Sequence, residues 1–539
     1  MTDTAMRWNG WGDPERAAPL PEPVLAILRD GLGVRTRGTT SVQVETLAAP
    51  PTRLSDAAVD ALRGVVGDDH LLMDDASRVA HTRGKSTTDL LRMRAGDLAD
   101  APDAVVVPGS HDEVVELLTV AGEHGIAVVP FGGGTSVVGG LAPDADGRAV
   151  VAVDLRRLDR VTEVDVESRL ATLEAGLRGP TAERLLAEHG LSVGHFPQSF
   201  EFASVGGFAA TRSSGQASSG YGRFDQAVVG LRVATPAGTW ELGGIEATAA
   251  GPDLRQVVLG SEGAFGIVTA VTVKVHPTPT ERRYEGWRFD TFAAGCLALR
   301  RLAQDGPRPT VLRLSDEAET AVGLARGGEV GTAGSGSGGC LLIVGYEGAD
   351  AVVRREAGAA VLTDSGGQNL GPGPGEDWLA GRFHGPYLRD SLLDAGALCE
   401  TLETAATWTA LPTAYQRVRE ALTTSLGEQG SPPLVLCHVS HTYASSASLY
   451  FTVVSAQTDE PVVQWQRAKA AATDAMVETG ATITHHHAVG RDHQPWLAQE
   501  IGELGVRVLQ AIKAEVDQDN ICNPGVLIPG VLTPSAPAP

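Results

Sequence analysis

The sequence predicts an α+β protein in two main parts, and three observations support this. Residues 102–131 show a β-α-β pattern, short strands with turn residues follow to about residue 280, and helices then alternate with strands. We expect an N-terminal helical segment over residues 1–100, a first domain over 101–280 and a second domain that caps it over 281–480. A C-terminal segment over 481–528 and a disordered tail over 529–539 would complete the chain.

The individual elements follow from local patterns. In the first domain, the β-branched run DAVVVP predicts a strand, residues 110–125 predict an amphipathic helix ending at Gly125, and IAVVPF predicts a strand that runs into a glycine-rich loop. In the second domain, residues 291–306 predict a helix, and CLLIVGYEG and SASLYFTVVS predict strands. Two glycine-rich segments, 326–339 and 365–377, are expected to be loops.

Composition and charge exclude several classes of protein. The 539-residue chain carries a net charge of −23, which argues against a nucleic-acid partner. It has no apolar run long enough to cross a bilayer, no secretory signal pattern and no polybasic cluster. The five cysteines show no CxxC spacing, so we expect reduced thiols in a cytoplasmic protein. Only four lysines are present, so a basic pocket would consist of arginines.

Glycine-rich segments mark a candidate cofactor site. The first, PFGGGTSVVGG at residues 130–140, could turn several backbone N–H groups toward an anion, but alone it could be an ordinary turn. It matches neither the GxGxxG pattern of a dinucleotide fold nor a Walker A loop. Two further segments, 194–230 and 260–269, are also rich in glycine and small residues and also border strands. Together the three segments favour a nucleotide cofactor.

The same segments resemble a known flavoprotein domain. PDAVVVPGSHDEVVELLTVAGEHGIAVVPFGGGTSV, HFPQSFEFASVGG, YGRFDQAVVG and LGSEGAFGIVTAVTVKV are similar to the FAD-binding domain of the vanillyl-alcohol oxidase / p-cresol methylhydroxylase (PCMH) superfamily. The resemblance implies a two-subdomain FAD-binding domain with an α+β cap domain, and noncovalent FAD, since the first loop lacks a histidine and His195 precedes the second. The implied FAD-binding residues are Pro130, Gly132, Gly133, Gly134, Thr135, Ser136, Pro197, Gln198, Ser199, Ser204, Gly206, Gly207, Thr211, Ser214, Tyr221, Gly222, Glu262, Gly263 and Ile267.

Further segments resemble one branch of that superfamily. MRWNGWG, VLRLSD, YLRDSLLDAG, LETAATW, HTYASSASLYFTV and GATITHHHAVG are similar to alkyldihydroxyacetone phosphate synthases, in unbroken order over most of residues 6–527. The resemblance implies ether lipid synthesis, in which a fatty alcohol replaces the acyl group of acyl-dihydroxyacetone phosphate through an adduct at flavin N5. It also implies that the segment at 481–528 returns to the FAD domain.

The histidine triplet at 485–487 has three possible interpretations. It is internal, which argues against a purification tag. A metal site is conceivable, but we expect no Cys, Asp or Glu partner nearby to complete a ligand set, and the His-x-Gly-Asp-Gly-Asn-x-His metal motif of related dehydrogenases is missing from HVSHTYASSASLYF. We therefore expect no metal and interpret the histidines as groups that position or protonate substrate. The preceding GATIT predicts a strand, which would place His485 and His487 on one face.

The resemblance also assigns roles to individual residues. Tyr450 matches an acid/base tyrosine whose pKa the triplet and nearby arginines would lower, with Tyr443 as its rival. Arg313 matches an arginine near flavin N5, and Arg389 one suited to the substrate phosphate. The catalytic set is therefore Tyr450, His485, His486, His487 and Arg313, with Arg389 and Tyr443 as substrate-binding residues.

One departure from the family pattern concerns the substrate more than the fold. The family's Tyr-Asp-Ala-Gly is Tyr-Ala-Ser-Ser here, with Ala444 in place of aspartate. Two alternatives stay open: an FAD-dependent oxidase or dehydrogenase of a 2-hydroxy acid or other alcohol, and a non-catalytic FAD-binding protein. For the synthase we expect small-molecule lipid substrates, a homodimer and peripheral contact with a membrane.

Overall fold

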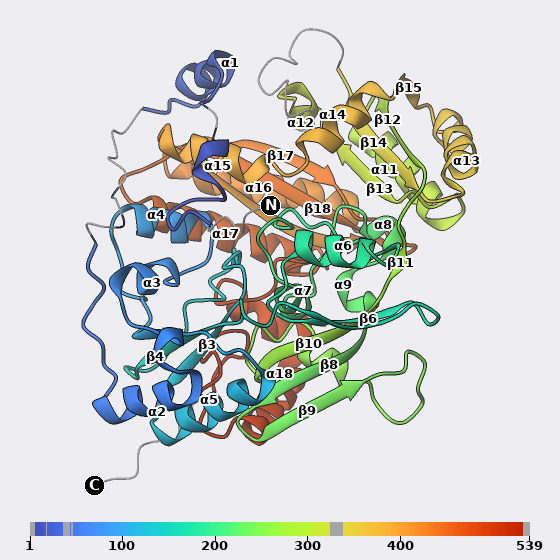
Figure 1. Ribbon diagram of the computed structural model, residues 1–539. Coiled ribbons are helices and arrows are strands. Elements are labelled where there is room, and N and C mark those ends of the chain that lie inside the picture. The colour runs from blue at the N-terminus through green and yellow to red at the C-terminus, as the bar shows by residue number, and fades with distance from the viewer. Residues whose placement is uncertain are drawn as a thin grey trace.

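The predicted α+β class is confirmed by three main sheets and the helices around them (Figure 1). The computed structural model describes residues 6–17, 19–35, 42, 44, 47–323 and 338–531. No helix in these ranges is long and apolar enough to cross a membrane. Most of the tail expected at 529–539 and most of the loop expected at 326–339 lie outside the described residues.

The first sheet contains the β-α-β unit. Its strands are, in spatial order, β1 (Leu71–Leu72), β2 (Ala104–Val106), β4 (Val150–Asp154) and β3 (Ala127–Phe131). The helices of this region are η4 (Asp68–His70), α2 (Asp56–Val66), α3 (Asp75–Ala80), α4 (Thr87–Arg94) and α5 (His111–Glu123). Helix α5 starts where the Ser110 side chain accepts the Glu113 N–H, and it ends before Gly125, which has φ of +63°. Because β2, β4 and β3 run parallel, the loop after β3 leaves from the carboxyl edge of the sheet.

The second sheet is antiparallel and shares a hydrophobic core with the first. Its strands are, in spatial order, β5 (Val161–Asp165), β6 (Leu170–Glu174), β10 (Ile267–Lys274), β8 (Val228–Thr235) and β9 (Gly238–Gly243). A small ribbon pairs β7 (Leu191–Ser192) with β11 (His276–Pro277). The helices here are α6 (Gly179–Ala187), α7 (Val205–Ala210), α8 (Ser218–Tyr221), α9 (Phe224–Ala227) and α10 (Arg255–Val258).

The third sheet has seven antiparallel strands and its own core. In spatial order they are β15 (Gln368–Gly371), β12 (Arg282–Phe289), β14 (Cys340–Glu347), β13 (Val311–Ser315), β17 (Leu434–Val439), β18 (Ser446–Ala456) and β16 (Ala397–Thr407). The helices are α11 (Phe292–Gln304), α12 (Glu317–Ala321), α13 (Ala351–Asp364), α14 (Gly373–Gly381), α15 (Gly385–Asp394), α16 (Leu411–Glu428) and α17 (Pro461–Glu478). The expected loop at 365–377 is therefore wrong, since it contains β15 and the start of α14.

The two faces of β18 have different roles. Leu449, Phe451 and Val453 alternate along the strand and belong to the core that α16 and α17 cover. Tyr450, which lies between them in sequence, points to the opposite face, toward the first two sheets. The third sheet therefore separates a structural core from a functional surface.

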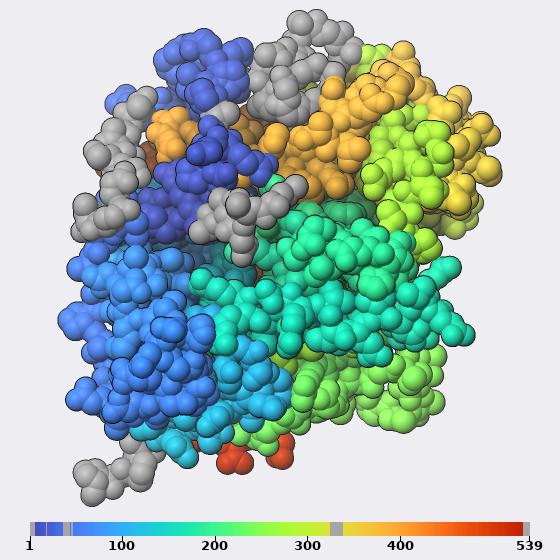
Figure 2. Space-filling view, viewed as in Figure 1, coloured from blue at the N-terminus to red at the C-terminus, as the bar shows by residue number. Residues whose placement is uncertain are grey.

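The described N-terminal segment packs at one end of this surface, and the described part of the C-terminal segment packs against the first two sheets. The N-terminal segment contains η1 (Pro14–Arg16), α1 (Glu22–Ala26) and η2 (Ile27–Gly31), and it packs beside α15, as the blue and orange surfaces in Figure 2 show. The C-terminal segment contains η5 (Gln494–Trp496) and α18 (Leu497–Val516), which lies next to the second sheet (Figure 1). After α18, Cys522 pairs with Val128 of β3.

Candidate active site

A cavity of about 440 Å³ lies between the glycine loops of the first two sheets and the open face of the third. Its walls also include α1 and η2 from the N-terminus and residues of the histidine triplet from the C-terminal segment. Segments distant in sequence therefore meet around one space.

The loop after β3 needs its glycines because other chain segments press against it. A Cβ on Gly133 would overlap the backbone oxygen of Phe202, and one on Gly132 would overlap the Ser204 hydroxyl. Gly134 has φ of +66°, a conformation that glycine adopts without strain. The Ser204 side chain in turn caps α7 by accepting the Gly207 N–H. The first and second glycine-rich segments thus form one packed unit at the cavity wall.

The third segment is held in place by the C-terminal part of the chain. The Glu262 carboxylate accepts the Val489 and Gly490 N–H groups at 3.1 and 2.7 Å. Asn523 Nδ2 donates to the carbonyls of Gly140 and Glu262, at 3.0 and 2.6 Å. Burial raises the pKa of Glu262 to about 7, although the two backbone donors act to lower it.

The structure brings nearly all the proposed cofactor residues to this cavity. Those that line it are Pro130, Gly132, Gly133, Gly134, Thr135, Ser136, Pro197, Gln198, Ser199, Ser204, Gly206, Gly207, Thr211, Ser214, Glu262, Gly263 and Ile267. Tyr221 and Gly222 are not among the lining residues. Tyr221 instead donates to Glu347 at 3.1 Å and stacks on His276, because α8 turns toward the β7–β11 ribbon.

The wall formed by the third sheet changes from polar to apolar over three rows of side chains. The pairing of β16, β18 and β17 places Glu403, Tyr450 and His438 in one row, Thr401, Thr452 and Leu436 in the next, and Cys399, Val454 and Leu434 in the third. Successive rows are two residues apart, about 6.7 Å along each strand. The apolar row packs against Leu28 of η2 and Leu392 of α15. The cavity therefore has a polar end and an apolar end.

The histidine triplet lies at the polar end, and its local structure differs from the expectation. Residues 481–489 form an irregular segment, not a strand, because the N–H groups of His485, His486 and His487 donate to the buried carboxylate of Glu403, at 2.7–3.2 Å, in place of a neighbouring strand. His486 and His487 line the cavity, and His485 lies behind them. The expectation that no acidic group lies near the triplet is also wrong, because folding places Glu403 of β16 beneath it.

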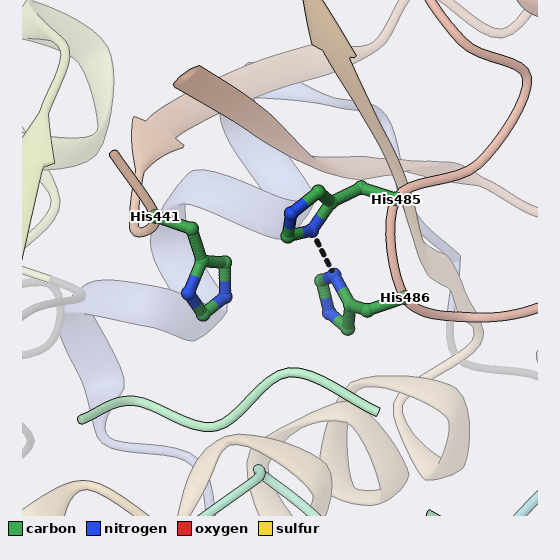
Figure 3. A group of neighbouring side chains, drawn as sticks. All are labelled: His441, His485 and His486. Atoms are coloured by element: carbon green, nitrogen blue, oxygen red, sulfur yellow. Dashed lines mark hydrogen bonds between the residues drawn. The ribbon is translucent and has the colours of Figure 1, made fainter. Parts of the chain in front are cut away.

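His441 joins His485 and His486 to form a cluster of three rings (Figure 3). His485 Nδ1 and His486 Nδ1 are 3.0 Å apart, and the Tyr443 hydroxyl lies 2.7 Å from His485 Nε2. One nitrogen from each of the three rings lies within 4.8 Å of the others, close enough to hold a metal ion. Existing hydrogen bonds already engage both nitrogens of His485, so metal-free operation stays our prediction.

Comparisons with known proteins identify the family. Residues 102–243 match a family model described as FAD binding domain, and residues 278–527 match one described as FAD linked oxidases, C-terminal domain. An alkyldihydroxyacetonephosphate synthase from Dictyostelium discoideum is 32% identical over 98% of this chain and 94% of its own length. The synthase from Trypanosoma brucei brucei is 33% identical over 97% of this chain and 92% of its own.

The chain belongs to the alkyldihydroxyacetonephosphate synthase family. A solved structure of such a synthase superposes with a TM-score of 0.81 at 30% identity, covering 97% of this chain and 99% of that one. A p-cresol methylhydroxylase structure, at 17% identity and a TM-score of 0.65, shares the fold. The membership proposed from sequence motifs is thereby confirmed.

FAD is the cofactor of this family member, and the cavity fits it. Gly132 and Gly133 are packed so closely against Ser204 and Phe202 that neither position accepts a Cβ, and both line the cavity. The backbone N–H groups of such a glycine loop suit a pyrophosphate. Ser136, Ser199 and Ser204 add hydroxyl groups to the same wall.

The expectation that the histidines lower the pKa of Tyr450 is corrected by the protonation states of the residues at the polar end. Burial raises the pKa of Tyr450 to about 12, despite a hydrogen bond with Thr401 and the nearby Arg313. Burial and the neighbouring rings hold the pKa values of His441 and His485 well below their usual range, and burial lowers that of His487 to about 3. These three histidines are therefore neutral, so they do not lower the pKa of Tyr450 as predicted.

The two arginines proposed from the family pattern both line the cavity, and both contact carboxylates. Arg313 pairs with Glu319 and lies 3.2 Å from His438 Nε2. Burial would raise the pKa of Glu319, but Arg313 and His438 lower it to about 2, so this carboxylate is charged. Arg389 donates to the Lys85 carbonyl at 2.5 Å and lies 3.3 Å from Asp390.

Several polar residues near the cavity escaped the sequence analysis. Glu403, His438 and His441 reach the polar end from three different strands or loops of the third sheet. Arg382, at the end of α14, also lines the cavity. The signals for Arg382, His438 and His441 were the patterns RFHGPYLRD and HVSH, which place charged or ring side chains near recognised motifs, and Glu403 lies within the family segment LETAATW.

Proposed function

We propose that the protein is an FAD-dependent alkylglycerone-phosphate synthase that makes the ether bond of ether lipids. Its substrates would be acyl-dihydroxyacetone phosphate and a fatty alcohol. The bond between C1 and the acyl oxygen breaks, a bond between C1 and the alcohol oxygen forms, and the alcohol proton leaves with the fatty acid. The exchange involves no net oxidation or reduction.

The observation that carries this proposal is the gradation of the third sheet. The row with Glu403, Tyr450 and His438 offers polar and ionisable groups, whereas the row with Cys399, Val454 and Leu434 offers none that is charged. Val24 and Leu28 extend the apolar end with N-terminal residues. A cavity with these two ends suits an amphiphile with a polar head and a long chain better than a small hydroxy acid.

FAD would supply an electrophilic ring system at the polar end. Tyr450 is placed to remove the C1 proton, and Arg313 to stabilise negative charge that develops nearby. His486 and the neutral His487 line the cavity and can orient the substrate or donate hydrogen bonds to it. Because the pKa of Tyr450 is about 12, proton removal requires either high pH or a change of environment when cofactor and substrate fill the cavity.

The direct test is turnover by the purified flavoprotein. Incubation with acyl-dihydroxyacetone phosphate and hexadecanol should yield an alkyl ether and a free fatty acid in equal amounts, measured by mass spectrometry. A flavin spectrum bleached by D-lactate or glycolate, without ether formation, would contradict the proposal and favour the oxidoreductase alternative.

We also propose noncovalent FAD, a homodimer, peripheral membrane contact and a cytoplasmic location. His195 is absent from the cavity lining, and its Nε2 contacts Ser213 at 3.0 Å, so it is engaged elsewhere. The five cysteines are free thiols, which agrees with a reducing compartment. If FAD is noncovalent, acid precipitation should release all of it into the supernatant. If the protein is a homodimer, light scattering should give twice the chain mass. Peripheral membrane contact predicts reversible binding to lipid vesicles.

A further inference from the structure

Glu403 is a buried carboxylate that is surrounded by hydrogen-bond donors. It lies on β16, is 2% exposed, and accepts the Thr484 hydroxyl at 2.6 Å and the three backbone N–H groups of the histidine triplet. Burial would raise the pKa of Glu403, but His486, with the other rings of the triplet, holds it well below its usual range. The carboxylate is therefore ionised.

The charge of Glu403 lies closer to one ring of the triplet than to the next. Its Oε2 lies 3.4 Å from His486 Nδ1, whereas its Oε1 lies 3.9 Å from His487 Nδ1. His486 Nδ1 also lies 3.0 Å from His485 Nδ1. One of these two Nδ1 atoms must therefore carry the hydrogen that the other accepts.

The position of the carboxylate decides which Nδ1 carries this hydrogen. If His485 were the donor, the lone pair of His486 Nδ1 would face the charged carboxylate at 3.4 Å, which is repulsive. With the hydrogen on His486 Nδ1, the same contact is attractive. His485 Nδ1 is then the acceptor, and its Nε2–H donates to the Tyr443 hydroxyl oxygen at 2.7 Å. All three contacts are satisfied when His486 carries its hydrogen on Nδ1.

The other ring nitrogen of His486 is thereby left as an acceptor at the cavity. His486 lines the cavity, and within the part of the chain that the structure describes no hydrogen bond occupies its Nε2. The ring is held by its neighbours, since its centroid lies 6.0 Å from that of Tyr450, in a stacked arrangement, and 5.4 Å from that of His441 (Figure 3). With the hydrogen on Nδ1, Nε2 presents a lone pair.

We propose that Glu403 is a positioning residue that fixes the hydrogen of His486 on Nδ1, so that His486 Nε2 accepts the proton of the fatty alcohol. Tyr450 is assigned to the C1 proton, so the alcohol needs a second acceptor. As the alcohol oxygen bonds to C1, its O–H bond breaks and the proton passes to Nε2. The carboxylate compensates the imidazolium that forms. The proton then passes to the fatty acid, which keeps the reaction balanced.

This inference deepens the proposed function and rests on it for the two substrates, so the first measurement reads the hydrogen position without turnover. In the FAD-loaded protein labelled with ¹⁵N-histidine, NMR should show a protonated Nδ1 and a bare Nε2 for His486, assigned by the loss of these signals in His486→Asn. Glu403→Gln keeps the shape of the side chain without its charge, so the hydrogen should move to Nε2.

Glu285→Gln is the matched control for this measurement. Glu285 is also a buried carboxylate of the third sheet, 4% exposed, but it lies on β12, pairs with Arg355 at 2.8 Å and does not line the cavity. Its replacement removes a buried charge from the same sheet, and it should leave the His486 signals unchanged.

The second measurement separates the alcohol step from removal of the C1 proton. Exchange of the C1 hydrogen with solvent deuterium needs no alcohol, so Glu403→Gln and His486→Asn should retain it. Ether formation with hexadecanol should fall by about 10²-fold or more in both variants, the usual cost of losing a positioned base. Hexadecanol fluorinated at C2 has a more acidic hydroxyl, so its rate should fall less. A merely structural role of Glu403 would slow the exchange and both alcohols equally.

Several results would overturn the assignment. It fails if His486 keeps its hydrogen on Nδ1 in Glu403→Gln, or if C1 exchange falls as far as ether formation. If Glu403→Gln unfolds or loses FAD, His486→Asn decides, because ether formation at the wild-type rate in that variant would rule out His486 as the acceptor. A wild type that forms no ether, but in which the hydrogen position depends on Glu403, would uphold the positioning role and reject the proposed reaction.

Discussion

Tyr450 is the residue whose environment bears most directly on the proposed reaction. Replacing it with phenylalanine removes one oxygen and keeps the ring that stacks on His438 at 4.8 Å. We expect FAD binding to stay normal and turnover to fall by about 10²–10⁴, the usual cost of losing a positioned acid or base. Solvent exchange of the C1 hydrogen, followed by mass spectrometry in deuterated water, should be lost with it.

The wild-type pH dependence provides the control for this variant. The pKa of Tyr450 in the protein is about 12. The fraction of Tyr450 present as tyrosinate therefore rises about tenfold per pH unit between pH 7 and 9. We expect kcat/KM to rise over this range in the wild type but not in Tyr450→Phe. Near-normal exchange by the variant would transfer the role to Tyr443 or to the histidines.

His195 provides a test of stability that does not depend on catalysis. Burial, with the nearby Arg223 charge, lowers its pKa to about 3 from the ordinary 6.5. Between these values the unfolded chain binds a proton that the folded chain rejects, so stability is full above pH 6.5 and falls as the pH drops toward 3. In His195→Gln, the melting temperature measured by scanning calorimetry should fall less steeply between pH 7 and 5 than in the wild type. An unchanged pH profile would mean that His195 is protonated in the folded protein.

At the scale of elements, the loop after β3 depends on close packing against the segment around Phe202. Even one added methyl group at Gly133 would overlap the Phe202 backbone, so Gly133→Ala should displace the loop and reduce FAD occupancy, measured from the ratio of flavin to protein absorbance. Gly427→Ala is the control: a Cβ at this position in α16 meets nothing within 4 Å, and alanine favours helix by about 1 kcal/mol. Full flavin occupancy in Gly133→Ala would show that the loop can shift without affecting the cofactor site.

The strand rows predict how the cavity selects chain length. Val454→Phe adds bulk to the apolar row opposite Leu28, and displacing even two methylene groups of a bound chain costs about 1.6 kcal/mol, roughly 15-fold in affinity. We expect kcat/KM for a sixteen-carbon acyl chain to fall relative to an eight-carbon chain. The matched change Val353→Phe, on a side chain of α13 that is 69% exposed, should leave the ratio unchanged. Equal losses for both chain lengths would place the chain elsewhere.

At the scale of the whole molecule, the C-terminal segment connects parts of the FAD site that are far apart in sequence. Asn523 is the clearest link, since its buried amide donates to carbonyls in the first and third glycine-rich segments. Asn523→Ala would leave both carbonyls without this donor, at a cost on the order of 2–5 kcal/mol. We expect a lower melting temperature and faster loss of FAD on dilution. Asn369→Ala, at an exposed position of β15, should change neither, and equal effects of the two would argue against this link.

The sequence by itself determined the cofactor class, the family and the α+β architecture. Glycine at positions 132–134, the periodic apolar residues of 111–123 and the alternating residues of 446–456 are local constraints, because turn geometry and strand or helix periodicity act over a few residues. Only the tertiary structure decided the chemistry around Tyr450. Glu403 beneath the histidine triplet and His441 beside it come from segments tens of residues away, and no local pattern records such approaches. Burial likewise set the raised pKa of Tyr450 and the neutral state of His485, because desolvation depends on the whole fold that surrounds a group.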